Sequence, residues 1–281
     1  MPHDDYPQTP LRRRYLDTSR PESPPTATLR PLSILQVVPP WLPVPPRGYG
    51  GIEAVCATLV DGLVARGHHV ELVAGGGLQV PVPLHAAFPE PMPDRINDSI
   101  VDLLHGAAAQ EIAMSRHFDV IHEHTWLGAL LGPLRPVPTL TTIHNLPSRD
   151  YLTYTEIVSK NSALVGLSRS HLSGLPTVRW SGYVHNGIPT DKYPFSPESA
   201  REDWVFYLGR ATRAKGMHAA IDAARAAGRR IILAAKCNEP PEKKYFAEYI
   251  APRLGRDNCR CPPGAPPGRT GSRRDRRPGS R

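Results

Sequence analysis

An arginine and a lysine stand five positions apart in the segment YLGRATRAKG, at residues 207–216. The apolar run before Arg210 predicts a buried strand, and the alanine-rich run after Lys215 predicts a helix. A turn from strand to helix exposes backbone N–H groups and the positive end of the helix dipole. Arg210 and Lys215 at such a turn indicate a phosphate or diphosphate site. Solvated loop cations are the alternative, because no phosphate-loop lysine motif is present.

Two histidines end another predicted strand, in the segment DVIHEH. Side chains two positions apart lie on the same face of a strand, so we expect His122 and His124 to point the same way. A metal site would need a third ligand close by, and the sequence offers none, so we predict no metal. A histidine packed in the core is the alternative interpretation.

A pair of glycines precedes a predicted helix in the segment RGYGG. The dinucleotide-binding pattern G-x-G-x-x-G is absent. Gly50 and Gly51 nevertheless allow backbone N–H groups to approach a ligand closely at the start of the helix. A tight turn that requires a positive φ is the alternative.

Strands and helices are predicted to alternate along the chain, which is typical of an α/β fold with parallel sheets. The predicted strands are 32–38, 69–77, 119–124, 137–144, 162–168, 204–209 and 230–236, and the predicted helices are 52–67, 97–116, 126–131, 150–160, 217–228 and 240–254. One complete α/β domain and the beginning of a second are therefore expected.

Domain boundaries follow from changes in composition. We expect a disordered segment over 1–30, a Rossmann-like domain over 31–188, a linker over 189–203, a partial second Rossmann-like domain over 204–258 and a disordered tail over 259–281 rich in Arg, Pro and Gly. The tail begins where the next buried strand is due. A shift of reading frame in GC-rich DNA would produce such a composition, and a natural basic tail is the alternative.

The net charge of +8 over 281 residues belongs mainly to the tail. Its seven arginines and one aspartate account for six of the eight positive charges, so the rest of the chain offers no basic face for nucleic acid. The four cysteines are sparse, and Cys56 falls on the apolar side of a predicted helix. With no disulfide pattern, no apolar signal core and no spanning run, we expect a cytoplasmic protein.

Four segments together resemble glycosyltransferase family 4, which has the GT-B fold of two Rossmann-like domains facing across a cleft. They are PPRGYGGIE, DVIHEHTW, HNGIPTDKY and YLGRATRAKG, and with the elements around them they span about residues 32–256 in the family's order. The resemblance implies transfer of a sugar from a nucleotide diphosphate sugar, with retention at the anomeric carbon. It implies no cofactor and no essential metal.

The resemblance also assigns roles to the residues that match the motifs. Arg210 and Lys215 would neutralise the donor diphosphate, and Gly50 and Gly51 would face the donor from the first domain. His124 would lie beside the transferred sugar as the catalytic candidate, by positioning and hydrogen bonding. His122, His144 and Asn145 would line the acceptor side. The acceptor itself (a glycan, a lipid or a small molecule) stays open, as does a peripheral contact with a membrane.

One departure from the family pattern concerns two glutamates eight positions apart, which the family carries late in its second domain. No two glutamates of this chain have that spacing. The segment should follow residue 258, where the arginine-rich tail stands instead, so we expect a truncated chain with impaired activity. Two alternatives stay open: a GT-B sugar-nucleotide epimerase, and nucleic-acid binding through the tail.

Overall fold

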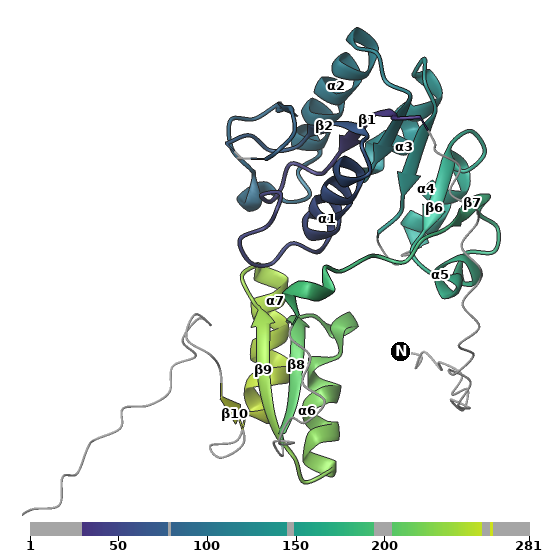
Figure 1. Cartoon of the computed structure of the whole chain (residues 1–281). Coiled ribbons are helices and arrows are strands. Elements are labelled where there is room, and N and C mark those ends of the chain that lie inside the picture. The colour runs from purple at the N-terminus through teal and green to yellow at the C-terminus, as the bar shows by residue number, and fades with distance from the viewer. Residues whose placement is uncertain (1–29, 78–79, 145–148, 194–203, 255–258, 261–281) are drawn as a thin grey trace, which may run out of the picture. The chain divides into compact units, whose positions relative to one another are not determined.

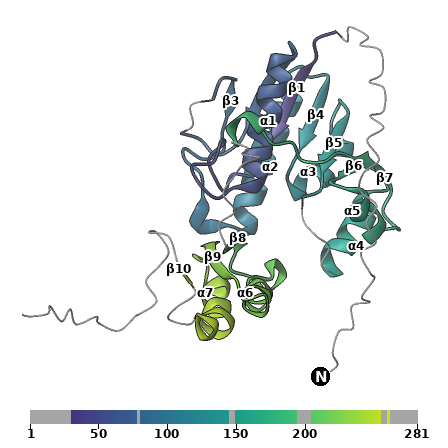
Figure 2. The ribbon, with the colours of Figure 1, turned by 60° about the horizontal axis from the view of Figure 1, so that its bottom comes forward.

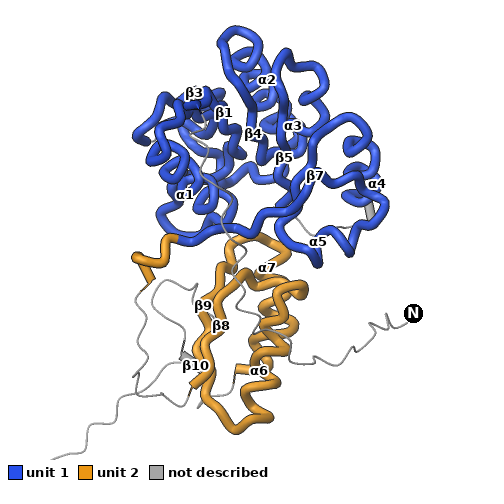
Figure 3. Tube along the Cα trace, turned by 45° about the vertical axis from the view of Figure 1, so that its right-hand side comes forward, with its two compact units in different colours: residues 1–188 blue, residues 189–281 orange. Residues whose placement is uncertain are grey.

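The computed structural model describes residues 30–77, 80–144, 149–193, 204–254 and 259–260. The chain divides into two compact units, Met1–Ile188 and Pro189–Arg281, which Figure 3 distinguishes by colour. Each unit contains one parallel sheet, and each is described by itself.

The sheet of the first unit has seven strands in the order β3-β2-β1-β4-β5-β6-β7, and every neighbouring pair is parallel (Figure 2). The strands are β1 Ser33–Val37, β2 His69–Val73, β3 Leu84–His85, β4 Val120–Glu123, β5 Thr139–Thr142, β6 Ala163–Gly166 and β7 Trp180–Tyr183. The chain runs outward from β1 to β3 and then returns to the other side of β1 to add β4. This reversal of direction lies between β1 and β4.

Five helices join these strands, and polar caps start three of them (Figure 1). The helices are α1 Gly51–Ala65, α2 Ser99–Ser115, α3 Trp126–Leu131, α4 Arg149–Val158 and α5 Arg169–Gly174. The side chains of Asp98, Thr125 and Ser168 accept backbone N–H groups at the starts of α2, α3 and α5. Such caps satisfy donors that the first helical turn leaves without a partner.

Apolar residues alternate between the two faces of this sheet, and helices cover both. Leu35 of β1 and Ile121 of β4 pack against the α2 side chains Ala109 and Ala113. On another part of the core, Cys56 of α1 packs against Leu72 and is fully buried, which confirms its expected packing role. Burial on both faces explains why these strands read as continuous apolar runs.

A buried ion pair fixes the end of β4 to the segment that leads into β5. Arg135 donates to Glu123 over 2.7 Å, and both side chains are at most 1% exposed. Arg135 also donates to Gln110 of α2, and Thr125 donates to Glu123. Each of these buried charges needs the other, because a single buried charge has lost its contact with water and has no opposite charge to offset that loss.

The second unit has a three-stranded parallel sheet in the order β10-β9-β8. Its elements are β8 Trp204–Arg210, α6 Met217–Ala226, β9 Arg230–Lys236, α7 Pro240–Tyr245 and β10 Cys259–Arg260. A π-helical turn over Phe246–Ile250 and a 3₁₀ turn over Ala251–Arg253 follow α7 directly. Pro252 in that last turn cannot continue an α-helix.

Among the residues that the structure describes, one face of the second sheet is well covered and the other is not. Met217 and Ile221 of α6 and Tyr245 of α7 form a buried cluster with Ile231 and Leu233 of β9. In contrast, Phe206 and Leu208 of β8 are 53% and 76% exposed. The sheet therefore keeps an apolar surface in contact with solvent.

The expected α/β fold with parallel sheets is confirmed, and every predicted helix and strand has a counterpart within a few residues of its expected bounds. The sequence missed the short elements β3, β7 and α5. It also predicted no structure from residue 259 onward, whereas Cys259–Arg260 pair with β9 as β10, and residues 261–281 lie outside the described ranges. No helix within those ranges combines the length and the apolar character needed to cross a membrane.

Gly128 of α3 generates a prediction about the buried ion pair. A Cβ atom at this position would lie 2.1 Å from Cδ of Glu123 and 2.3 Å from its Oε2. Because Arg135 holds that carboxylate in place, Gly128→Ala should lower the free energy of unfolding by about 3 kcal/mol. Urea unfolding followed by circular dichroism measures this loss.

Gly62→Ala in α1 is the matched control. Its added Cβ would meet only the flexible Arg66 side chain, at 3.6 Å, so alanine should raise the free energy of unfolding by up to about 1 kcal/mol. Equal effects of the two substitutions would show that the Glu123 contact is not responsible.

Candidate functional site

The carboxyl ends of β1 and β4 mark the point where the strand order of the first sheet reverses. In open parallel sheets, ligands bind in the crevice outside the strands at such a reversal. Gln36 stands one residue before the end of β1, and its register partner on β4 is His122. His124 directly follows β4. The two predicted histidines therefore lie where the topology of the sheet favours a ligand.

Polar side chains from three neighbouring strands form a hydrogen-bonded group here, which we call the histidine row: Gln36, His122, His124, Thr142 and His144. Gln36 bridges the first two imidazoles, with Nε2 3.3 Å from Nδ1 of His122 and Oε1 3.0 Å from Nε2 of His124. His124 Nδ1 lies 2.9 Å from Nε2 of His144, and His122 Nε2 lies 2.8 Å from Thr142 Oγ1.

The imidazoles of the row are neutral at pH 7. Burial, with a smaller contribution from a nearby histidine, lowers the pKa of His122 to about 4 and that of His144 to about 4. Burial holds the pKa of His124, which is 6% exposed, well below its ordinary value, and repulsion from His122 and His144 adds to the effect. A neutral imidazole has one donor nitrogen and one acceptor nitrogen. The histidines of the row therefore interact with other groups through hydrogen bonds and not through charge.

The glycine pair lies at the start of α1. A Cβ on Gly50 would come within 2.7 Å of Pro46, so packing excludes a side chain there, whereas the space around Gly51 is open. Gly50 has φ 160° and ψ 80°, and neither glycine lies in the left-handed region. Glu53 in the first turn of α1 is 4% exposed, and burial raises its pKa.

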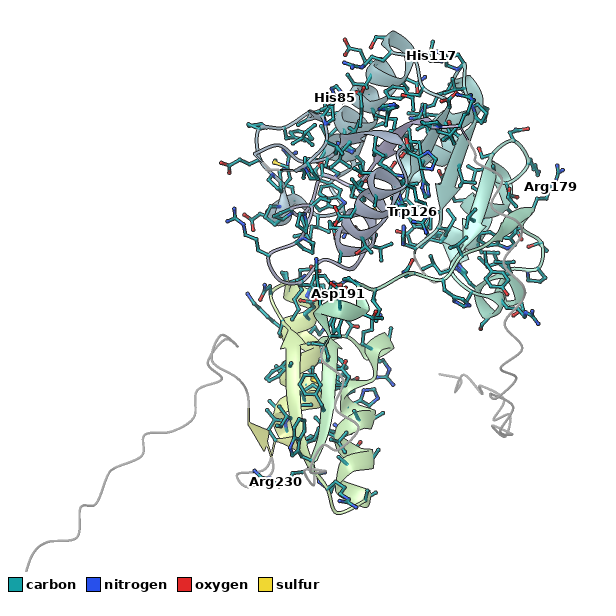
Figure 4. The ribbon with its side chains drawn as sticks, in the orientation of Figure 1. His85, His117, Trp126, Arg179, Asp191 and Arg230 are labelled. Carbon is teal, nitrogen blue, oxygen red and sulfur yellow. The ribbon has the colours of Figure 1, made fainter. Side chains whose placement is uncertain are left out.

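Aromatic side chains pack together at the start of α3. Trp126, labelled in Figure 4, begins α3 two residues after His124 and stacks on Tyr151 of α4 with ring centroids 4.2 Å apart. Tyr154 donates to the Trp126 carbonyl. Asn145, the remaining residue expected on the acceptor side, lies outside the described residues.

In the second unit, Arg210 ends β8, and Lys215 closes the 3₁₀ turn before α6. Gly216 between that turn and α6 has φ 69°, a left-handed conformation that glycine adopts without strain. No side chain caps the start of α6. The predicted arrangement of strand, cationic turn and helix is therefore present.

Sequence reasoning missed the ionic partners of Arg210. Its Nε donates to Glu242 over 2.7 Å, and its Nη2 donates to Glu239 over 2.8 Å. Lys236, the register partner of Arg210 at the end of β9, lies 2.5 Å from Glu239. Arg210, Lys236, Glu239 and Glu242 form an ion-pair cluster at the carboxyl end of this sheet.

Glu242 of this cluster is held in its ionised form. Burial alone would raise the pKa of Glu242, but hydrogen bonds from Arg210 and from the backbone N–H groups of Glu239 and Asn238 lower it below its ordinary value. A capping box between Glu239 and Glu242 starts α7, and this pattern was the one signal in the sequence that could have located both acids.

Across the described ranges, no three histidine, cysteine or acidic side chains are grouped so that they could hold a metal ion. The polar groups described above are neutral imidazoles that form hydrogen bonds in the first unit, and cations paired with carboxylates in the second.

The low histidine pKa values generate a pH prediction. Between pH 6.5 and about 4 the unfolded chain binds protons at His122 and His144 that the folded chain excludes. The free energy of unfolding is therefore highest above pH 6.5. It decreases as the pH is lowered from 6.5 toward 4, by up to about 1.4 kcal/mol per pH unit for each histidine. Urea unfolding at a series of pH values measures the slope.

Two substitutions distinguish the source of this slope. His122→Gln should make it shallower, because it removes a buried group that resists protonation. His117→Gln should leave it unchanged, because His117 is exposed (Figure 4). An unchanged slope in His122→Gln would contradict the assignment.

Comparisons with solved protein structures find proteins with the same type of fold. AviGT4, a glycosyltransferase involved in avilamycin A biosynthesis, is 23% identical with a TM-score of 0.58, and the match covers 82% of this chain and 63% of AviGT4. The catalytic domain of starch synthase IV from Arabidopsis thaliana, bound to ADP and acarbose, is 17% identical with a TM-score of 0.58, and the match covers 82% and 74%. No curated protein sequence matches the chain.

These likenesses confirm the expected GT-B type of α/β fold, and this chain spans less than two thirds of the length of AviGT4. The family model described as Glycosyltransferase Family 4 matches residues 49–192, about half of the chain. The matched stretch includes the glycine pair and the whole segment from His122 to His144. The chain belongs to glycosyltransferase family 4.

Proposed function

We propose that this chain carries the substrate-binding residues of a transferase. The enzyme would move a sugar from a nucleotide diphosphate sugar to an acceptor, with retention of configuration. The observation that carries the proposal is the pair Arg210 and Lys215 on the turn between β8 and α6. Family membership supports the same conclusion. Retention of configuration follows from the family resemblance alone.

Charge development explains why two cations suit this reaction. When the bond to the sugar breaks, the departing nucleoside diphosphate gains negative charge. Fixed cations close to it stabilise the transition state more than the ground state, and this difference is what accelerates a reaction. Lys215 is exposed, and among the described residues its ammonium group has no ion-pair partner, so it is available to an incoming phosphate.

Lys236 is the third cation of the proposed donor site. It is level with Arg210 on the neighbouring strand, and its side chain is 13% exposed. In the chain without donor, Glu239 neutralises both Arg210 and Lys236. A donor diphosphate competes with this carboxylate, which is 30% exposed and also takes part in the cap of α7.

The first unit contributes hydrogen bonds to the sugar in this proposal. His124, His122 and His144 offer neutral ring nitrogens, and Gly50 and Gly51 offer backbone N–H groups at the start of α1. Neutral hydrogen-bonding groups suit a sugar, whose hydroxyl groups both donate and accept. The identities of the sugar, the nucleotide and the acceptor are left open by these residues.

Binding of inorganic pyrophosphate tests the donor site directly. Charge-assisted contacts to phosphate contribute about 1.5–3 kcal/mol each, so Arg210→Ala should weaken binding by about tenfold or more. Isothermal titration calorimetry on the whole chain, with pyrophosphate, ADP, UDP and GDP as probes, measures the loss.

Arg230→Ala is the matched control for charge. Arg230 begins β9, at the opposite end of the strand from Lys236, and Figure 4 labels it there. Its removal changes the net charge by the same amount but should leave pyrophosphate affinity unchanged. Equal losses for the two variants would mean that pyrophosphate responds to net charge only, and the proposed donor site would be wrong.

Glu239→Gln should strengthen pyrophosphate binding by about tenfold, because the amide keeps the shape of the side chain but no longer neutralises Arg210 and Lys236. Glu248→Gln is the control, since Glu248 is exposed and pairs only loosely with Lys244, at 3.9 Å. The same calorimetry applies. Unchanged affinity in Glu239→Gln would exclude competition between this carboxylate and the diphosphate.

A further inference from the structure

A tyrosine hydroxyl joins the two ends of the turn between β8 and α6. We call residues 210–216 the cationic turn, because Arg210, Arg213 and Lys215 stand in it. The hydroxyl of Tyr207 in β8 lies 3.2 Å from the carbonyl oxygen of Arg210 and 3.2 Å from that of Lys215. A phenol has a single hydrogen to donate, so the two carbonyls share it. One side chain of the strand thus contacts both the beginning and the end of the turn.

We propose that Tyr207 is a positioning residue for the donor diphosphate: its hydroxyl joins both ends of the cationic turn and so holds Arg210 and Lys215 in the arrangement that an incoming diphosphate meets. The part that concerns the diphosphate rests on the proposed function. The part that concerns the turn applies to the protein without a ligand and rests on the contacts alone.

The cationic turn needs an external contact because its own bonds are short in range. The N–H of Lys215 donates to the Thr212 carbonyl over 3.1 Å, and the N–H of Gly216 donates to the Arg213 carbonyl over 3.0 Å. Three positive charges within six residues also repel one another when no anion is bound. The hydroxyl of Tyr207 ties the Lys215 end of this turn back to β8.

Gly209 makes room for the Tyr207 ring at the end of β8. Residues two positions apart lie on the same face of a strand. A Cβ atom on Gly209 would lie 3.0 Å from the hydroxyl oxygen of Tyr207 and 3.3 Å from its Cζ. Gly209 does not have a positive φ, so contact with Tyr207, and not backbone conformation, is what disfavours a side chain here.

Apolar packing accounts for the ring of Tyr207 but not for its hydroxyl. The ring packs against the buried cluster that contains Met217 and Ile221, and a phenylalanine would offer the same apolar surface. Burial raises the pKa of Tyr207, with a smaller contribution from Tyr245, so the phenol keeps its proton at neutral pH and can donate it to the carbonyls. The hydroxyl is therefore the group to which we assign the positioning role.

Two other tyrosines lie close to the cationic turn and differ from Tyr207. The hydroxyl of Tyr245 accepts the backbone N–H of His218 over 3.3 Å and lies 2.6 Å from its Nδ1, so it anchors the first turn of α6. The guanidinium of Arg213 lies over the ring of Tyr249, 5.3 Å from the centroid. No described residue hydrogen-bonds to the Tyr249 hydroxyl, so Tyr249→Phe is the matched control for Tyr207→Phe.

Amide hydrogen exchange, followed by NMR on the whole chain without ligand, tests whether Tyr207 holds the turn. Tyr207→Phe keeps the ring and removes the hydroxyl. Exchange at Lys215 and Gly216 should become faster by about two- to tenfold, the effect of losing one neutral hydrogen bond. Exchange at Ala211 should not change, because its N–H donates to the Lys236 carbonyl of the neighbouring strand. Unchanged rates at Lys215 and Gly216, or equal acceleration at Ala211, would overturn the proposal.

Gly209→Ala reaches the same contact without altering Tyr207. Its methyl group should push the hydroxyl away from the carbonyls, so exchange at Lys215 and Gly216 should again be faster. Tyr249→Phe should exchange as the wild type does. Equal acceleration in Tyr249→Phe and Tyr207→Phe would contradict a specific role of the Tyr207 hydroxyl.

Calorimetric titration with pyrophosphate tests the positioning of the cations. Tyr207→Phe should weaken binding by about two- to tenfold, and Tyr249→Phe should not. In a Lys215→Ala background the effect of Tyr207→Phe should shrink, because one of the cations that the hydroxyl places is gone. Wild-type affinity in Tyr207→Phe would overturn the role in diphosphate binding. If the wild type itself binds no pyrophosphate, the proposed donor site is wrong, and the exchange experiment still decides whether Tyr207 holds the turn.

Discussion

The parallel pairing of β1 with β4 is the constraint on which the first unit depends. Its register aligns Gln36 with His122 and Val37 with Glu123. Because side chains alternate across a strand, this one pairing sends Gln36 and the histidines to one face and Glu123 to the other. On that second face Glu123 meets Arg135. A shift of this register by one residue would move each set of side chains to the opposite face of the sheet. The histidine row and the buried ion pair therefore depend on the same register.

The histidine row and the ion-pair cluster handle polar groups in opposite ways. In the row, burial removes charge: the three imidazoles are neutral, and hydrogen bonds join them to one another, to Gln36 and to Thr142. In the cluster, charge is kept and compensated: two cations and two carboxylates share three short contacts and a longer one of 3.7 Å, close to the ends of β8 and β9. Arg210 and Glu239 are 32% and 30% exposed, so water also stabilises these two ions.

The sequence predicted those parts of the molecule whose signals are local. The runs that became β1, α3 and β9 have clear apolar patterns, and Arg210 and Lys215 lie within one turn. It could not identify Gln36, because this single polar residue stands in an apolar strand and its partners His122 and His124 approach it only when β1 pairs with β4. The partners of Arg210 likewise follow 29 and 32 residues later and meet it only through sheet pairing. The strand β7 escaped because Gly182 and a register shift interrupt its pattern.

The neutrality of the histidine row has a consequence for the range of its forces. A set of hydrogen-bonded neutral rings acts only on groups in direct contact, and dissolved ions do not weaken it. The charges of the ion-pair cluster and of Lys215 act over longer distances, and salt screens them, with a Debye length of about 8 Å at physiological ionic strength. Ionic strength is therefore a variable that separates the two units: it weakens the interactions among the charges of the second and leaves the directional contacts of the first as they are.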